Sequence, residues 1–270
     1  MKLNDFALLG CAGIGFSTDD VICVADLYLN PVTEETAKKY ICSAAEGKSH
    51  RIAIYTHWHY DHGLRPREMK HLLGEGFTLY VPEGLAQRHK ARKRFIRRSR
   101  ELTEIIDDYK QEGRIIWVSD GTRITASGTE ITAFQSEHGK INPFNYLRRS
   151  ELFPSGFYEK LKASKEHLLH PGGNTLGYSI KEGDKKYVIL GSCGICEDKA
   201  PKDIDTLFMP LLHEPPYEYE RGIIATISPR RVVPTHNDGA DPLIPEVDPA
   251  YFAKAVSPTE VIIKHPLHMQ

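Results

Sequence analysis

His57-Trp58-His59-Tyr60-Asp61-His62 begins one residue, Thr56, after Arg51–Tyr55, a mainly apolar run typical of a buried strand. Residues i and i+2 of an extended chain point to the same side, so His57 and His59 can converge on one metal ion. Gly63 allows a sharp turn that can carry Asp61 and His62 toward a neighbouring ion. These imidazoles and one carboxylate suit Zn²⁺, with Mn²⁺, Fe²⁺ or Co²⁺ as substitutes, and the segment holds no thiolate that would favour softer metals.

Short apolar strands alternate with charged, helix-forming segments along the rest of the chain. The predicted strands are 6–9, 21–25, 51–55, 77–81, 115–118, 122–126, 129–134, 176–180, 186–190, 206–211 and 231–234. The predicted helices are 32–46, 66–73, 82–111 and 249–256. We interpret the glycine-rich stretch 10–15 as the turn of an opening hairpin. This alternation predicts an α/β protein.

Composition narrows the choice of protein class. A chain of 270 residues with 40% hydrophobic and 26% charged residues can bury a sizeable core, and no linker divides it, so we expect one domain over 1–270. Its formal net charge of -1 gives no overall field for nucleic acid or membrane. We find no export signal and no apolar run long enough to span a membrane. Five cysteines are too few for a secreted disulfide framework, so we expect a cytoplasmic protein without a membrane partner.

These features together resemble the metallo-β-lactamase-fold hydrolases, whose His-x-His-x-Asp-His signature is complete at 57–62. Further along, Ser136-Glu137-His138-Gly139 and Val232-Val233-Pro234-Thr235-His236 resemble the family's later histidine motifs. Asp26 resembles the aspartate that often ends an early strand of this fold. The resemblance covers residues 8–236 and implies a four-layer αββα sandwich, in which two mixed β-sheets are flanked by helices.

The resemblance also implies a ligand set for two divalent metal ions, with Zn²⁺ as the expected metal. His57, His59 and His138 would hold the first ion, and Asp61, His62 and His236 the second. A water shared by two cations has its pKa lowered toward neutrality, so it can act as hydroxide at physiological pH. We therefore expect a metal-dependent hydrolase in which Asp61 and His62 also count as catalytic residues.

The chain departs from the family pattern after the strand ending at Leu190. Most dinuclear members have a bridging aspartate there, whereas this sequence has Ser192, so the second ion should bind more weakly. Cys193 is one residue out of register but could substitute, and Asp26 and Asp238 are further candidates beside this position. Cys193 and Cys196 form a C-x-x-C pair, which is either redox-active or simply two thiols near the metal loop.

Substrate contacts are less specific in sequence. We assign Tyr60, Arg148, His170 and His213 as candidate substrate-binding residues, and expect the aromatic-rich insertion 140–170 to form a lid. Within the predicted basic helical insertion 82–111, residues 88–100 carry eight basic residues among thirteen. They form either a phosphate-binding surface or a solvated face paired with the acidic residues Glu101, Glu104, Asp107 and Asp108.

We predict hydrolysis of a small, anionic ester, lactone or phosphoester, with similarity to the ascorbate-6-phosphate lactonase branch carried by Asn174–Ile180 and the ending Val232-x-Pro234-x-His236. One alternative is a ribonuclease or phosphodiesterase that uses the basic helix as its nucleic-acid contact. A second is a mononuclear iron oxygenase resembling sulfur dioxygenases, because Ser192 removes the bridging carboxylate. A third is a binding protein with a vestigial site. A small-molecule substrate is expected, and homo-oligomerisation is left open.

Overall fold

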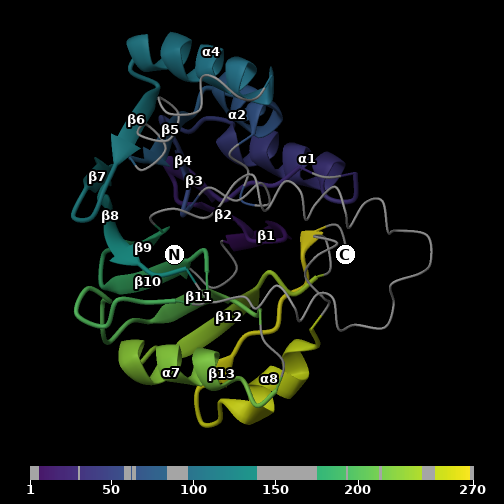
Figure 1. Cartoon of the computed structure of the whole chain (residues 1–270), viewed down its shortest axis with the longest axis vertical. Coiled ribbons are helices and arrows are strands. Elements are labelled where there is room, and N and C mark those ends of the chain that lie inside the picture. Colours follow the sequence, from purple (N-terminus) through teal and green to yellow (C-terminus); the bar gives the residue numbers. More distant parts are fainter. Residues whose placement is uncertain are drawn as a thin grey trace.

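The computed structural model describes residues 6–29, 31–57, 62, 65–83, 97–138, 175–192, 194–212, 215–238 and 247–267. Two β-sheets form its centre (Figure 1). The first sheet has strands in the order β1-β2-β3-β4-β5-β6. Its strands are β1 (Phe6–Gly10), β2 (Gly13–Ser17), β3 (Val21–Ala25), β4 (His50–Ile54), β5 (Thr78–Pro82) and β6 (Ile115–Val118). Strands β1 to β3 are antiparallel and β3 to β6 are parallel, so the sheet is mixed.

The second sheet is also mixed, with strands in the order β13-β12-β11-β10-β9-β8-β7. Its antiparallel part runs from β7 to β10, and its parallel part from β10 to β13. The strands are β7 (Arg123–Ala126), β8 (Thr129–Ser136), β9 (Thr175–Glu182), β10 (Lys185–Leu190), β11 (Thr206–Pro210), β12 (Arg231–Thr235) and β13 (Glu260–Val261).

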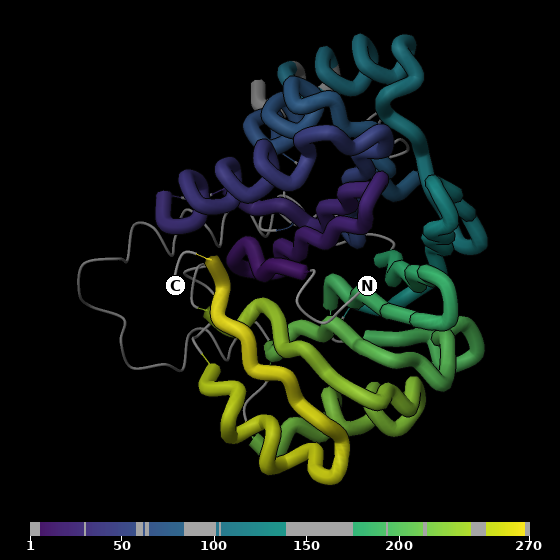
Figure 2. The backbone as a smooth tube through the Cα atoms, turned by 180° about the vertical axis from the view of Figure 1, so that it is seen from behind, coloured from purple at the N-terminus to yellow at the C-terminus, as the bar shows by residue number. Residues whose placement is uncertain are grey.

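Helices cover the outer face of each sheet. Figure 1, and Figure 2 from behind, show α1 (Glu34–Ala45), α2 (Pro66–Gly74) and α4 (Arg97–Gln111) on the first sheet. They also show α7 (Glu218–Ile227) and α8 (Pro249–Ala255) on the second. The expected four-layer αββα sandwich of two mixed sheets is therefore confirmed.

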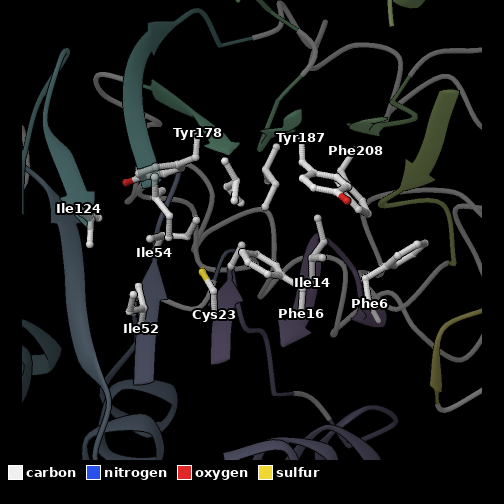
Figure 3. Packing of buried hydrophobic residues seen from close by; sticks show 14 of the residues in the cluster. Phe6, Ile14, Phe16, Cys23, Ile52, Ile54, Ile124, Tyr178, Tyr187 and Phe208 are labelled. Carbon is white, nitrogen blue, oxygen red and sulfur yellow. The ribbon is translucent and has the colours of Figure 1, made fainter. Parts of the chain in front are cut away.

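The strand sequences show why the two sheets pack against each other. Along β3, Ile22 and Val24 contact the core beneath the helices, whereas Val21, Cys23 and Ala25 contact the core between the sheets. Because both faces are buried, the strand is apolar throughout and does not alternate with polar residues. Figure 3 shows this inter-sheet core, and fully burying each large apolar side chain contributes roughly 1.5–3 kcal/mol.

Two sequence predictions need correction. Residues 13–15, which we predicted as part of the turn 10–15, belong to β2 (Gly13–Ser17), and the turn itself is only Cys11–Ala12. The predicted helix 82–111 begins too early, since Pro82 ends β5 and α4 begins at Arg97. Residues 84–96, which carry most of the basic run, lie outside the described part. In the described part, Glu101 forms an ion pair with Lys70 of α2, at 2.6 Å.

Helix α7 and strand β13 were not predicted. The α7 sequence contains Gly222 and several β-branched residues, which have low helix propensity. Its helical form is stabilised by Ile223, Ile224 and Ile227, which pack into the core beneath the second sheet. Among the described helices, none is sufficiently long and apolar to cross a lipid bilayer.

Candidate metal centre

Four histidines of the predicted ligand set lie together at the carboxyl ends of strands from both sheets. His57 follows β4, His138 follows β8 and His236 follows β12, while His62 comes five residues after His57. The ring centroid of His57 lies 3.9 Å from that of His62 and 5.1 Å from that of His138. The His62 ring is 5.4 Å from the His236 ring. The fold thus gathers four imidazoles that are up to 179 positions apart in the chain, the difference between 236 and 57.

The cluster is closed on one side and open on the other. His57, His62 and His236 expose 3% of their surface or less, whereas His138 is partly exposed. Neutral imidazoles keep a nitrogen lone pair that can bind a metal ion. His138 is thus the most exposed of the four rings.

Asp26 anchors the buried end of the site. It directly follows β3, and its backbone adopts a positive φ of 47°, which is rare for a residue other than glycine. Its Oδ1 accepts the backbone N–H of Thr56 at 2.8 Å, and its Oδ2 accepts the Thr56 hydroxyl at 2.5 Å. The same Oδ2 lies 2.9 Å from Nδ1 of His62. A carboxylate beside Nδ1 places the His62 proton there, so Nε2 carries the lone pair.

Thr56 connects this anchor to the second sheet. Its carbonyl accepts the backbone N–H of Leu176, at 2.8 Å, and its hydroxyl lies 3.1 Å from Nδ1 of His57. Gly191, which follows β10, leaves no room for a side chain, since a methyl group there would overlap the Thr56 hydroxyl. Gly191, at the end of β10, is therefore in close contact with Thr56, the residue before His57.

On the opposite side, the turn between β1 and β2 closes against the end of β12. The carbonyl of Cys11 accepts the backbone N–H of His236 at 2.9 Å, and the Asp238 carboxylate accepts the N–H of Cys11 at 3.0 and 3.2 Å. Sγ of Cys11 lies 3.3 Å from Nε2 of His236. Asp238 is thus close to the site but holds the backbone of the turn, and it was predicted only as a residue near the bridging position.

The loop after β10 lies against the loop that carries His138. Ser192 is 1% exposed and so lies inside the protein at the predicted bridging position. The Ser136 hydroxyl donates to the carbonyl of Gly194, and a side chain at Gly194 would overlap the backbone of Glu137. This contact fixes the distance between the Ser192 loop and the end of β8.

Cys196 does not have the environment of a reactive redox thiol. Burial, followed by the negative charges of Glu137 and Asp198, raises its pKa, whereas reactive thiols have a lowered pKa. Cys193 lies outside the described residues. The described half of the C-x-x-C pair therefore favours the interpretation as a thiol near the metal loop.

A second carboxylate, Glu68 of α2, supports the loop that follows Asp26. Glu68 is fully buried, and its Oε1 accepts the backbone N–H of Leu29 at 3.0 Å. Arg65 forms an ion pair with Glu68, donates to the Leu29 carbonyl at 2.8 Å and stacks over the ring of Tyr28. Burial raises the pKa of Glu68, and Arg65 partly opposes that rise. Because α2 begins just after His62, this pair ties the histidine motif to the Asp26 loop.

Several predicted site residues cannot be placed. His59, Tyr60, Asp61, Arg148, His170, Cys193 and His213 lie outside the described residues, as does the predicted lid 140–170. Within the described ranges, no three His, Cys, Asp or Glu residues form a metal-binding group by themselves. The four described histidines are therefore a partial set, since the predicted ligands His59 and Asp61 of the same motif are among the residues left out.

Sequence reasoning missed the parts of the site that depend on long-range contacts. Thr56 and Glu68 were not singled out, and Cys11 was noted only as one of five cysteines. Thr56 stands directly before the motif, which is a usable signal for a residue that orients a ligand. Cys11 is 225 positions from His236, and no local pattern connects the two.

Comparison with known proteins was consistent with this geometry. Residues 27–239 match the model of a beta-lactamase superfamily domain. No curated protein matches the chain in sequence. Among solved structures, the chain is similar to Igni18, a metallo hydrolase from Ignicoccus hospitalis, with a TM-score of 0.59 and 16% identity over 97% of this chain and 94% of that one.

Two further structures have the same fold at lower similarity. The metallo-beta-lactamase fold protein YhfI from Bacillus subtilis has a TM-score of 0.54 and 13% identity, covering 97% of this chain and 95% of that one. CmlA, a diiron beta-hydroxylase from Streptomyces venezuelae, has a TM-score of 0.52 and 13% identity over 97% of this chain and 53% of its own. At these identities the structural similarity supports the fold alone.

Proposed function

The chain belongs to the beta-lactamase superfamily, and on that basis we propose that it is a metal-dependent hydrolase acting on a small, anionic ester, lactone or phosphoester. The observation that carries this proposal is the cluster of His57, His62, His138 and His236 at the strand ends, backed by the Asp26 carboxylate. The rings of His57 and His62 are buried with an oxygen beside each Nδ1, an arrangement that has little value for packing alone. It is the arrangement that metal-binding histidines require.

The donor set fits divalent cations. Neutral imidazoles are ligands for Zn²⁺, Fe²⁺ and Mn²⁺, and the motif residues His59 and Asp61 would add one imidazole and one carboxylate. We propose His57, His59 and His138 as ligands of one ion, and Asp61, His62 and His236 as ligands of the other. Such ions supply Lewis-acid polarisation of the substrate and a water whose pKa is lowered toward neutrality.

The residues of the chain would have three tasks in this reaction. Asp26 and Thr56 orient imidazoles so that their Nε2 atoms face the site. The buried position of His57 and His62 excludes bulk water from the closed side, which strengthens electrostatic interactions with the substrate. The partly exposed His138 lies on the side through which substrate would enter. Tyr60, Arg148, His170 and His213 stay candidates for substrate contact.

We propose zinc and a dinuclear site in the native protein, and a reducing, cytoplasmic setting with a small-molecule substrate. The lactonase-like branch is the finer assignment that the β9 sequence Thr175–Ile180 favours. The mononuclear iron oxygenase is the second candidate, and Ser192 in place of a bridging carboxylate is the feature that favours it. CmlA, which has the same fold, is described as a diiron enzyme, so that neighbour does not itself favour a single ion. Metal analysis separates the two candidates, since zinc or manganese at two equivalents supports the hydrolase and iron at one equivalent supports the oxygenase.

The test of function is a screen of lactones, phosphodiesters and thioesters against the metal-loaded protein. His57→Ala should abolish both metal uptake and turnover, whereas His50→Ala, an exposed histidine at the start of β4, should leave both unchanged. If turnover of the identified substrate persists in metal-free His57→Ala protein, the metal-dependent hydrolase is refuted.

A further inference from the structure

The cluster contains one donor atom that the histidine motif does not supply. Sγ of Cys11 lies 3.3 Å from Nε2 of His236 and 3.9 Å from Nδ1, so it is closer to Nε2. Cys11 is buried, and it comes from the β1–β2 turn at the edge of the first sheet. Its approach to His236 brings the two sheets together at the site.

We propose that Cys11 is a thiolate ligand of the metal ion held by His236. This inference rests on the proposed function, because it concerns the second of the two proposed ions. It adds a sulfur donor to a site for which the sequence indicated only nitrogen and oxygen. Coordination converts the Cys11 thiol to a thiolate and releases its proton to solvent, so one positive charge of the ion is neutralised without any oxidation.

The spacing of the two atoms is that of ligands sharing one ion. Zinc–sulfur bonds are about 2.3 Å and zinc–nitrogen bonds about 2.0–2.1 Å, so two such donors at angles of about 90–110° lie roughly 3.1–3.6 Å apart. The observed 3.3 Å between Cys11 Sγ and His236 Nε2 falls inside that range. In the metal-free protein the same separation suits an S–H···N hydrogen bond, which coordination of both atoms to one ion would replace.

Charge gives a second and independent argument. Ser192 is buried at the position where a carboxylate would neutralise the two ions, and a serine hydroxyl supplies no charge. A thiolate at Cys11 would restore one negative charge on the His236 side of the site. Sulfur donors also favour zinc over manganese or magnesium, so the proposal predicts the metal preference of this position.

The backbone around Cys11 is fixed at both ends. Its carbonyl accepts the N–H of His236, and its N–H donates to the Asp238 carboxylate. Its φ of 51° is unusual for a residue with a side chain, and the neighbouring Gly10 and Gly13 give the turn its shape. These contacts hold Sγ and the His236 ring in one relative position, which a shared ion requires.

Cobalt titration tests the proposal without an activity assay. In Co²⁺-loaded wild-type protein, a thiolate ligand gives a near-ultraviolet sulfur-to-cobalt charge-transfer band, separate from the visible d–d bands. We expect Cys11→Ser to lose the charge-transfer band, to keep the d–d bands, and to bind the second Co²⁺ at least about tenfold more weakly. Cys42→Ser, on the exposed side of α1, is the remote control, and Cys193→Ser tests the competing thiol.

The outcomes separate this inference from the proposed function. Visible cobalt bands without a charge-transfer band in the wild type, or a charge-transfer band that survives in Cys11→Ser, would overturn the role of Cys11 while leaving the metal site intact. Loss of that band in Cys193→Ser would also overturn it. Absence of any His57-dependent cobalt binding would overturn both.

A second measurement covers the case in which Cys11→Ser does not fold. In zinc-loaded Cys42→Ser/Cys193→Ser/Cys196→Ser protein, X-ray absorption should still show one sulfur neighbour at about 2.3 Å from zinc. Cys23 is the other remaining cysteine, and it is packed between the sheets. Zinc with nitrogen and oxygen neighbours alone in that protein would overturn the proposal.

Discussion

The hydroxyl oxygen of Thr56 lies 3.1 Å from Nδ1 of His57. Its one proton is already donated to Asp26 Oδ2, so at His57 the oxygen can only accept. The proton of His57 therefore sits on Nδ1, and Nε2 is left with a lone pair. Asp26 thus sets the tautomer of His62 directly and that of His57 through Thr56, although Asp26 itself is not among the proposed metal ligands.

Thr56→Val should weaken metal binding by about 10–100-fold, because valine keeps the shape of threonine but cannot accept the His57 proton. Thr56→Ser keeps the hydroxyl and should bind metal within about threefold of wild type, because the hydrogen bond to His57 is retained. Competition with a chromogenic chelator measures both affinities. Equal affinities for the valine and serine variants would refute the relay through Thr56.

Local patterns predicted the α/β class and the histidine motif at 57–62, whereas the family resemblance supplied the αββα sandwich and the candidates His138 and His236. The apolar run of β4 and the motif at 57–62 are adjacent in the chain, and the β-strands other than β2 and β13 are marked by their own composition. The residues that orient the ligands were not predictable in this way. Asp26 reaches Thr56 across 30 positions, and only the parallel pairing of β3 with β4 places the two strand ends side by side.

The errors in predicting the strands also come from contacts between residues far apart in the chain. Residues 13–17 contain two glycines, which usually indicate a turn, yet they form β2 because Ile14 and Phe16 are buried in the inter-sheet core. Gly15 has a local reason as well, since a side chain there would overlap the ring of Tyr40 from α1. Burial against the second sheet, together with the close approach of Gly15 to α1, outweighed local propensity.

Asp26→Asn should lower metal affinity by about 10–100-fold and destabilise the fold by about 1–3 kcal/mol. If the asparagine Oδ1 still accepts the backbone N–H of Thr56, the NH₂ group takes the place of Oδ2. That group is a donor, and it would face two other donors, the Thr56 hydroxyl and His62 Nδ1. Asp184→Asn, in the exposed turn between β9 and β10, is the control for loss of charge. Metal titration and urea unfolding give the two values, and wild-type affinity in Asp26→Asn would contradict the anchoring role.

Gly191→Ala should reduce both stability and metal affinity, because the added methyl group displaces the Thr56 hydroxyl from Asp26 and His57. Overpacking of this kind costs about 1–3 kcal/mol. Gly222→Ala, at an open position on α7, meets no atom within 4 Å and should stabilise the helix by about 0.5–1 kcal/mol. Thermal unfolding should therefore move in opposite directions for the two variants, and tolerance of Gly191→Ala would show that this contact is not tight.

Glu68 gives a prediction for pH dependence. Its folded pKa is raised by burial above the ordinary 4.5, so between these two pKa values the folded protein binds more protons than the unfolded chain. The stability that Glu68 contributes is then complete below 4.5 and is lost as pH rises through the folded pKa. Relative to wild type, Glu68→Gln should therefore gain stability as pH rises across this interval, since glutamine has no proton to lose.

Glu35→Gln provides the opposite case on the surface of α1. The hydrogen bond from Lys39 lowers the pKa of Glu35, so its contribution is present above 4.5 and is lost as pH falls through the lower folded pKa. Urea unfolding of wild type and both variants at several pH values should give stability differences of opposite slope, with the Glu35 difference small because the pair is exposed. If the difference in unfolding free energy between wild type and Glu68→Gln did not change with pH, burial would not raise the pKa of Glu68.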